Sequence, residues 1–234
     1  MRILAFESSA KAASVALLTD GILEAESYLN CGQTHSSTLT KMAEDLLSVC
    51  ALTVQDVDAV AVAAGPGSFT GVRIGVAAAK GFAWGRELPC FGVSTLEAMA
   101  IACCHLEGTI CACMDARRSQ VYNALFQAEH GQLRRLSPDR AISLEELEAD
   151  LKKNKNPTFL VGDGAQLCYN TLGLSVPNLQ LLPEHLRLQR ASAVALAAWP
   201  RYEAGERPSG ADLTPNYLRL SQAERERLER MKGN

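Results

Sequence analysis

Residues 65–75 have the sequence Gly-Pro-Gly-Ser-Phe-Thr-Gly-Val-Arg-Ile-Gly, and few local folds accommodate so many glycines between two apolar segments. The apolar run before them, 59–64, is typical of a buried strand, and the run of small residues after them, 76–84, is typical of a helix. Unpaired N–H groups converge where a helix begins, and glycines let a ligand approach the backbone, so such a turn can bind an anion. The residues that would contact a nucleotide there are Gly65, Gly67, Ser68, Phe69, Thr70 and Gly71.

As glycine spacing alone, this pattern is not specific. It lacks the Gly-Lys-Ser/Thr ending of a Walker A loop, and Thr70 stands where a dinucleotide-binding fingerprint has its third glycine. A strand-to-helix turn that binds no ligand explains the pattern equally well. In either case Ser68 or Thr70 can cap the helix that follows.

The composition is that of an ordinary globular protein, with 234 residues, 47% of them hydrophobic and 21% charged. A net charge of −3 gives no general attraction to nucleic acid, so a partner would have to supply most of the basic surface for RNA. The eight cysteines lack CxxC pairs and lie mostly in apolar runs, which favours reduced, buried thiols over a zinc site. No run is long enough for a membrane span or a signal peptide, and we expect a cytoplasmic protein.

Hydrophobic patterning predicts two α/β units, the second a partial copy of the first. The first unit is expected to have strands at 3–6, 13–18, 22–29, 59–64 and 88–93, and helices at 36–50, 70–84 and 96–104. The second is expected to have strands at 109–115, 120–127, 133–142 and 158–162, and helices from Ser143 to about Lys153, at 165–172 and at 192–204. We therefore predict two lobes with a cleft between them, residues 1–104 and residues 105–234, the latter ending in a charged tail helix at 222–232.

The complete stretch 65–75 resembles the GPGSFTG-x-R-x-G signature of the bacterial TsaB (YeaZ) family. Residues 115–117 (Asp-Ala-Arg) with 121–122 (Val-Tyr) are similar to that family's D-A-R…V-Y segment, and 215–219 (Pro-Asn-Tyr-Leu-Arg) to its P-x-Y-L-R. The resemblance covers residues 1 to about 220. It implies a fold of two ribonuclease-H-like lobes with mixed sheets, as in the actin, sugar-kinase and Hsp70 superfamily. It also implies a part in forming N6-threonylcarbamoyladenosine next to the tRNA anticodon.

Comparison with the sister family TsaD (Kae1) suggests that this chain lacks catalytic groups. The first turn keeps Glu7, but Lys11 falls on an aspartate of TsaD, and an ammonium group repels a metal cation. The H-x-x-x-H metal ligands of TsaD fall on Thr95 and Met99, which are poor ligands for a divalent ion. We therefore predict no catalytic residue, no metal and no cofactor, although Lys11 could still contact a phosphate as a point charge.

Asp115 and Arg117 could form a catalytic pair in the cleft, but a structural ion pair is the commoner role for such residues. The Gly-x-Ser-x-Gly elbow of hydrolases is absent, because the segment from Gly67 to Gly71 is one residue too long. A Ser/His/Asp triad needs only to meet in space, and nothing in the sequence favours one.

The resemblance also implies a partner surface on the helices predicted at 36–50 and 70–84. TsaB proteins pair with TsaD through these helices and self-associate as homodimers through the same face when TsaD is absent, and the ATPase TsaE joins the pair. The expected interface residues are Leu39, Met42, Val72, Gly75, Val76 and Ala79.

We thus expect a non-catalytic subunit that activates TsaD and meets tRNA only through the complex. One alternative is a metal-dependent glycoprotease-like or nucleotide-hydrolysing enzyme that acts on its own. Another is a self-sufficient homodimeric binding protein.

Overall fold

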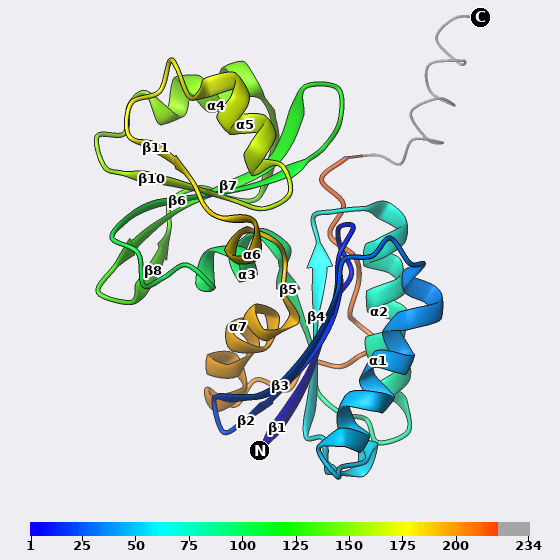
Figure 1. Cartoon of the computed structure of the whole chain (residues 1–234). Coiled ribbons are helices and arrows are strands. Elements are labelled where there is room, and N and C mark those ends of the chain that lie inside the picture. Colours follow the sequence, from blue (N-terminus) through cyan, green and yellow to red (C-terminus); the bar gives the residue numbers. More distant parts are fainter. Residues whose placement is uncertain (220–234) are drawn as a thin grey trace, which may run out of the picture.

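A computed structural model describes residues 1–219 and consists of two α/β lobes, each built on a mixed sheet (Figure 1). The first sheet has the order β3-β2-β1-β4-β5. Its strands are β1 (Arg2–Glu7), β2 (Ala13–Thr19), β3 (Ile22–Leu29), β4 (Ala59–Gly65) and β5 (Cys90–Ser94). Because β1, β4 and β5 run parallel, their carboxyl ends meet at one edge of the sheet, which is where ligands bind in open α/β sheets.

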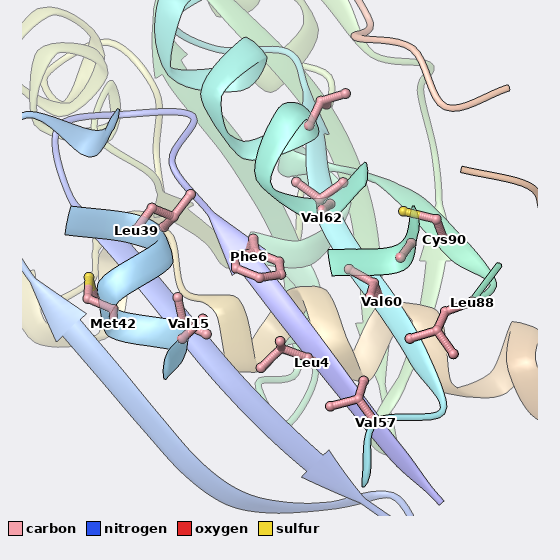
Figure 2. Close-up of a cluster of buried hydrophobic side chains, with 14 of the residues drawn as sticks. Leu4, Phe6, Val15, Leu39, Met42, Val57, Val60, Val62, Leu88 and Cys90 are labelled. Atoms are coloured by element: carbon pink, nitrogen blue, oxygen red, sulfur yellow. The ribbon is translucent and has the colours of Figure 1, made fainter. Parts of the chain in front are cut away.

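Helices cover both faces of this sheet. The helices α1 (His35–Val49) and α2 (Phe69–Trp84) pack on one face, and α7 (Ala191–Glu203) packs on the other (Figure 1). Alternation along β1 explains the two cores: Leu4 and Phe6 point toward α1 and α2 (Figure 2), whereas Ile3 points toward α7. The core beneath α1 and α2 consists mostly of larger aliphatic side chains, whereas the core beneath α7 is rich in alanines and also contains Ile3, Leu18 and Phe91.

The second sheet has the order β11-β10-β6-β7-β8, with β9 paired to β7. Its strands are β6 (Gly108–Asp115), β7 (Gln120–Glu129), β8 (Gln132–Arg135), β9 (Arg140–Ser143), β10 (Thr158–Val161) and β11 (Leu179–Leu181). One face packs against α4 (Leu144–Leu151) and α5 (Ala165–Leu172), and the other against α3 (Thr95–Ile101). A four-residue helix, α6 (Glu184–Arg187), precedes α7.

Most predicted elements are present within a few residues, and the exceptions have local causes. The strand predicted at 133–142 is two short strands, β8 and β9, because Pro138 cannot donate to a ladder and the chain turns there. Sequence patterning missed α6 and β11, which are too short to show a period. The predicted start of a helix at Ser143 is confirmed, and Ser143 and Glu146 form a capping box there. Thr34 occupies the N-cap position of α1, but its side chain makes no capping hydrogen bond.

The end of the described chain returns to the first lobe, which differs from the predicted assignment of all residues after 104 to the second lobe. The segment 208–219, here called the strap, runs along the first lobe after α7. Cys90 N–H donates to Pro208 O at 2.9 Å, and Leu213 belongs to the core beneath α2. The lobes are therefore interleaved in sequence, and the division between residues 104 and 105 itself stays a prediction. The predicted tail helix at 222–232 lies outside the described residues.

The eight cysteines are free thiols. The prediction of buried thiols is confirmed for five of them, Cys90, Cys103, Cys111, Cys113 and Cys168, while Cys31 is exposed. Among residues 1–219, no helix combines the length and the apolar character that crossing a membrane requires.

Candidate functional site

The three segments that carry the family resemblance meet around one cleft between the lobes. The cleft has a volume of about 650 Å³. It is lined by the first turn after β1, by the glycine turn between β4 and α2, by the turn between β6 and β7, and by the last residues of the strap. Segments that are distant in sequence thus line the same cleft.

The glycine turn fits closely against its own chain. Gly65 has a φ of +111°, and a Cβ there would lie 2.6 Å from Asn216 O of the strap. A Cβ on Gly67 would lie 2.5 Å from Ser9 O. Gly71, the last glycine of the turn, also has no space for a side chain, because a Cβ there would overlap Ser8 O. The glycines are therefore required by packing, whether or not a ligand binds.

Of the two predicted candidates for the cap of α2, Ser68 and Thr70, Ser68 occupies the N-cap position. The Ser68 hydroxyl accepts a hydrogen bond from Gly71 N–H at 3.3 Å, and Ser68 N–H donates to Ser9 O at 2.6 Å. Two donors of the expected anion cradle thus already have partners. Nucleotide contact at Gly65, Gly67, Ser68, Phe69, Thr70 and Gly71 stays a prediction.

The strap is fixed to both lobes at the mouth of the cleft. Arg73 Nε donates to the Tyr217 hydroxyl at 2.7 Å, and its guanidinium lies 3.7 Å from the centre of the Phe69 ring. The Phe69 and Tyr217 rings stack with 4.8 Å between their centres. Arg219 Nη1 then donates to Ala116 O of the second lobe at 2.5 Å. The strap therefore links the start of α2 to the turn that follows β6.

Asp115 and Arg117 both line the cleft. The contact between them is a hydrogen bond from Arg117 N–H to Asp115 Oδ1, at 2.7 Å. This contact involves the Arg117 backbone, so the guanidinium is not held in the structural ion pair that the sequence favoured. Neither group is placed next to a nucleophile by the contacts of the described residues.

Glu7 lies beneath the first turn with only 1% of its surface exposed. Burial raises the pKa of its carboxyl group to about 7, and the nearby charge of Asp163 adds to the effect. Glu7 Oε1 accepts a hydrogen bond from Ser9 N–H at 2.5 Å, while Oε2 has no partner within residues 1–219. Lys11, in contrast, is exposed and lines the cleft.

Thr95 and Met99, which fall on the TsaD metal ligands, are both buried at α3. Met99 packs against β6 and β7, and its sulfur lies beside Gly162. Within the described part of the chain, no group of three or more His, Cys, Asp or Glu side chains could hold a metal ion. Met99 therefore serves packing, whereas the buried hydroxyl of Thr95 has no hydrogen-bond partner within residues 1–219.

A second concave surface lies between α1 and α2. This groove, here called the α1/α2 groove, has a volume of about 690 Å³ and is largely apolar. Its apolar walls come mainly from α2, with Leu39 of α1 and Val54 of the turn before β4; the α2 residues are Ile74, Ala77, Ala78 and Phe82. His35 and Arg86 are the charged or titratable residues that line it.

The six predicted interface residues are all buried in the folded chain, which corrects their assignment as surface residues. Leu39, Met42, Val72, Val76 and Ala79 belong to the core between the two helices and the sheet. Gly75 is buried as well, and a Cβ there would lie 2.6 Å from Ser8 Oγ, so it faces its own chain rather than a partner. Of the six, Leu39 alone also reaches the groove.

The small and apolar residues that the sequence offers for close approach of another helix include Ala78, Gly81 and Phe82, and these line the groove. Ile74 and Ala77 were not singled out, because α2 is apolar on two faces. Ile74, Ala78 and Phe82 repeat at intervals of four, as core residues do, yet they line the groove. Gly81 was predicted to permit close approach of another helix, and nothing lies within 4 Å of a Cβ built there, so packing within the chain does not require a glycine. Tyr217 was noted only as part of a motif, and its contact with Arg73 spans 144 residues of sequence.

Two α/β lobes, mixed sheets and a cleft at the carboxyl ends of parallel strands define the class of this protein as two-lobed α/β, as predicted. Solved structures agree. YeaZ from Pseudomonas aeruginosa superposes with a TM-score of 0.76 at 27% identity, over 93% of this chain and 99% of that one. The activator of 2-hydroxyisocaproyl-CoA dehydratase from Clostridium difficile, solved with bound ADPNP, has a TM-score of 0.50 over 88% of this chain and 97% of its own. At 11% identity, that likeness shows the fold alone.

Sequence comparisons identify the family within this class. Residues 30–226 match the family model described as TsaD, tRNA N6-adenosine threonylcarbamoyltransferase. The tRNA threonylcarbamoyladenosine biosynthesis protein TsaB of Bacillus subtilis is 34% identical over 99% of this chain and its own full length. The TsaB of Escherichia coli is 43% identical over 55% of this chain and 56% of its own. The chain belongs to the TsaB (YeaZ) family, which takes part in tRNA threonylcarbamoyladenosine biosynthesis.

Proposed function

We propose that this chain is a non-catalytic subunit that binds and activates TsaD, the transferase of threonylcarbamoyladenosine synthesis. The observation that carries the proposal is the α1/α2 groove: an apolar hollow of about 690 Å³ on the two helices that the family resemblance associates with partner binding. A helix of TsaD that presents a narrow apolar ridge would fit between Ile74 and Leu39. In the lone protein a second copy would occupy the same groove and give a homodimer.

The chemistry of the cleft supports a non-catalytic role. Lys11 stands at the cleft where TsaD has an aspartate, and Thr95 and Met99 are buried where TsaD has its histidines. On this proposal TsaD supplies the transferase chemistry, TsaE joins the assembled pair, and tRNA meets this subunit only within the complex.

The test uses one substitution inside the groove and one outside it on the same helix. Gly81→Arg places a guanidinium in the groove without a clash in the folded chain, because nothing lies within 4 Å of its Cβ. We expect it to weaken TsaD binding by more than about a hundredfold, since burying an unpaired charge costs several kcal/mol. Trp84→Arg is the matched control, because Trp84 is 84% exposed and lies outside the groove.

Mass measurement of the mixed proteins by light scattering, and titration calorimetry of each variant, would report the result. Normal binding by Gly81→Arg would place the interface elsewhere. A homodimer that never exchanges into a heterodimer would argue for the self-sufficient binding protein instead. Stoichiometric zinc or iron, or clear ATP turnover by the lone chain, would favour the enzymatic alternative.

A further inference from the structure

The mouth of the cleft gathers cations and aromatic rings that docking at the α1/α2 groove does not use. Lys11 comes from the first lobe and Arg117 from the second, and both are exposed and line the cleft. Within residues 1–219 neither side chain forms an ion pair. Phe69 and Tyr217 lie at the same cleft, stacked on each other and held by Arg73.

We infer that this mouth binds single-stranded RNA, with Lys11 and Arg117 on phosphate groups and the Tyr217 ring available to a base. The inference rests on the proposed function, because that function brings a tRNA to the complex. Cations combined with exposed aromatic rings are the usual surface for unpaired nucleotides, since phosphates need charge and bases need a flat apolar face. Tyr217 is 42% exposed, so part of its ring remains open after it stacks on Phe69.

The geometry favours an extended RNA backbone over a free nucleoside triphosphate. A compact triphosphate is held by converging backbone N–H groups, but here Ser68 N–H already donates to Ser9 O, and Gly71 N–H to Ser68 Oγ. Asp115 and Asp163 also line the cleft and would repel several phosphate charges held together. An RNA strand carries one negative charge per nucleotide, and its phosphates are spaced along the chain. Two separate cations on opposite lobes can therefore each contact a different phosphate.

Charge also limits how strongly this surface acts alone. The chain has a net charge of −3, so its overall field repels RNA, and the two cations can add only local contacts. We therefore expect the mouth to guide a strand that TsaD holds more firmly. This expectation fixes the experiment, which must be run on the complex as well as on the lone chain.

The experiment measures binding of a fluorescent anticodon stem–loop RNA to the full chain with TsaD, by anisotropy between 50 and 200 mM KCl. Lys11→Gln and Arg117→Gln should each weaken binding roughly three- to tenfold and lower the slope of log K against log salt by about 0.7, the value for one phosphate contact on a single strand. Asp115→Asn should strengthen binding, because it removes a repelling charge and keeps the acceptor for Arg117 N–H. Arg134→Gln is the matched control, since Arg134 is exposed on β8 and does not line the cleft.

Three outcomes would overturn the inference. One is that the Lys11, Arg117 and Asp115 variants all bind RNA as the unmodified chain does. Another is that Arg134→Gln has as large an effect as Arg117→Gln. The third is that micromolar ATP displaces the RNA and binds less well to the Lys11 and Arg117 variants, which would assign the mouth to a free nucleotide.

Failure of the proposed function would be recognised separately. If the chain does not bind TsaD, docking at the α1/α2 groove fails, but the same variants can still be compared on the lone chain at 50 mM KCl. If TsaD binds normally and RNA binding is indifferent to all substitutions at the mouth, the proposed function stands and only this inference is lost.

Discussion

Glu7 combines an ionisable group with almost complete burial, and its titration should therefore affect folding. The pKa of its carboxyl group is about 7 in the folded chain against an ordinary 4.5, because burial disfavours the charged form. A raised pKa means that the folded state binds the proton more tightly than the unfolded state. The resulting stabilisation is complete below about pH 4.5 and is lost as the pH rises through 7. The total loss corresponds to about 3 kcal/mol.

The substitution Glu7→Gln should remove this dependence. The glutamine side chain keeps an oxygen to accept Ser9 N–H and cannot ionise. We expect the variant to gain stability relative to the unmodified chain as the pH rises from 5 to 8. Urea denaturation at four pH values measures this difference, and a difference that stays constant over that range would show that Glu7 does not titrate as its burial implies.

Substituting two glycines of α2 with alanine should change stability in opposite directions, because the space around the two glycines differs. At Gly71 a methyl group would overlap Ser8 O, which is backbone and cannot move aside, so Gly71→Ala should destabilise the fold by about 1–3 kcal/mol. At Gly81 nothing lies within 4 Å, and Gly81→Ala should stabilise the helix by about 0.5–1 kcal/mol. Equilibrium unfolding of the two variants side by side would test the assignment, which is wrong if Gly71→Ala is the more stable of the two.

At the scale of elements, α2 has two apolar faces with different roles. Val76 and Ala79 pack against the sheet, whereas Ile74 and Ala78 face the groove. The sequence predicted the helix correctly, but the face that it assigned to a partner is packed against the sheet, because both faces repeat apolar residues at helical spacing. Periodicity finds a buried face and cannot say whether the chain itself or a partner buries it.

This division predicts how substitutions on the inner face behave. Val76→Arg should unfold the lone chain rather than only release the partner, because an unpaired charge in the core costs roughly 3–5 kcal/mol. Gly81→Arg, on the groove side, should not lower the melting temperature. Thermal unfolding followed by circular dichroism separates the two cases, and a fully folded Val76→Arg chain would contradict the placement of Val76 in the core.

Over the whole molecule, sequence patterns predicted the turns and caps that depend on neighbouring residues. They did not predict contacts between segments that are far apart in sequence. The Asp20-Gly21 hairpin turn, the Ser68 cap and the Ser143 capping box were all predictable, because each depends on residues within a few positions of one another. The return of α7 and the strap to the first lobe was not predictable. The hydrogen bond from Asn216 N–H to Ala64 O depends on tertiary packing that no local pattern encodes. The three motifs were recognised separately, and only the fold brings them to one cleft.

The strap joins the two lobes through few contacts, so the loss of one of its side chains should affect both lobes. Tyr217→Ala removes both the stacking on Phe69 and the hydrogen bond from Arg73, and these contacts at a partly exposed site contribute about 1–3 kcal/mol. With Tyr217 removed, the hydrogen bond from Arg219 to Ala116 O loses its support. The turn after β6 should therefore exchange its amide hydrogens faster, although it lies in the other lobe.

Hydrogen exchange measured by mass spectrometry would follow both segments. Tyr169→Ala is the control, because Tyr169 is similarly exposed on α5 and far from the strap in sequence. If exchange rises in the strap alone, the lobes are held together by α3 and not by the strap. If it rises at residues 115–119 as well, the start of α2 and the turn of the second lobe belong to one cooperative unit.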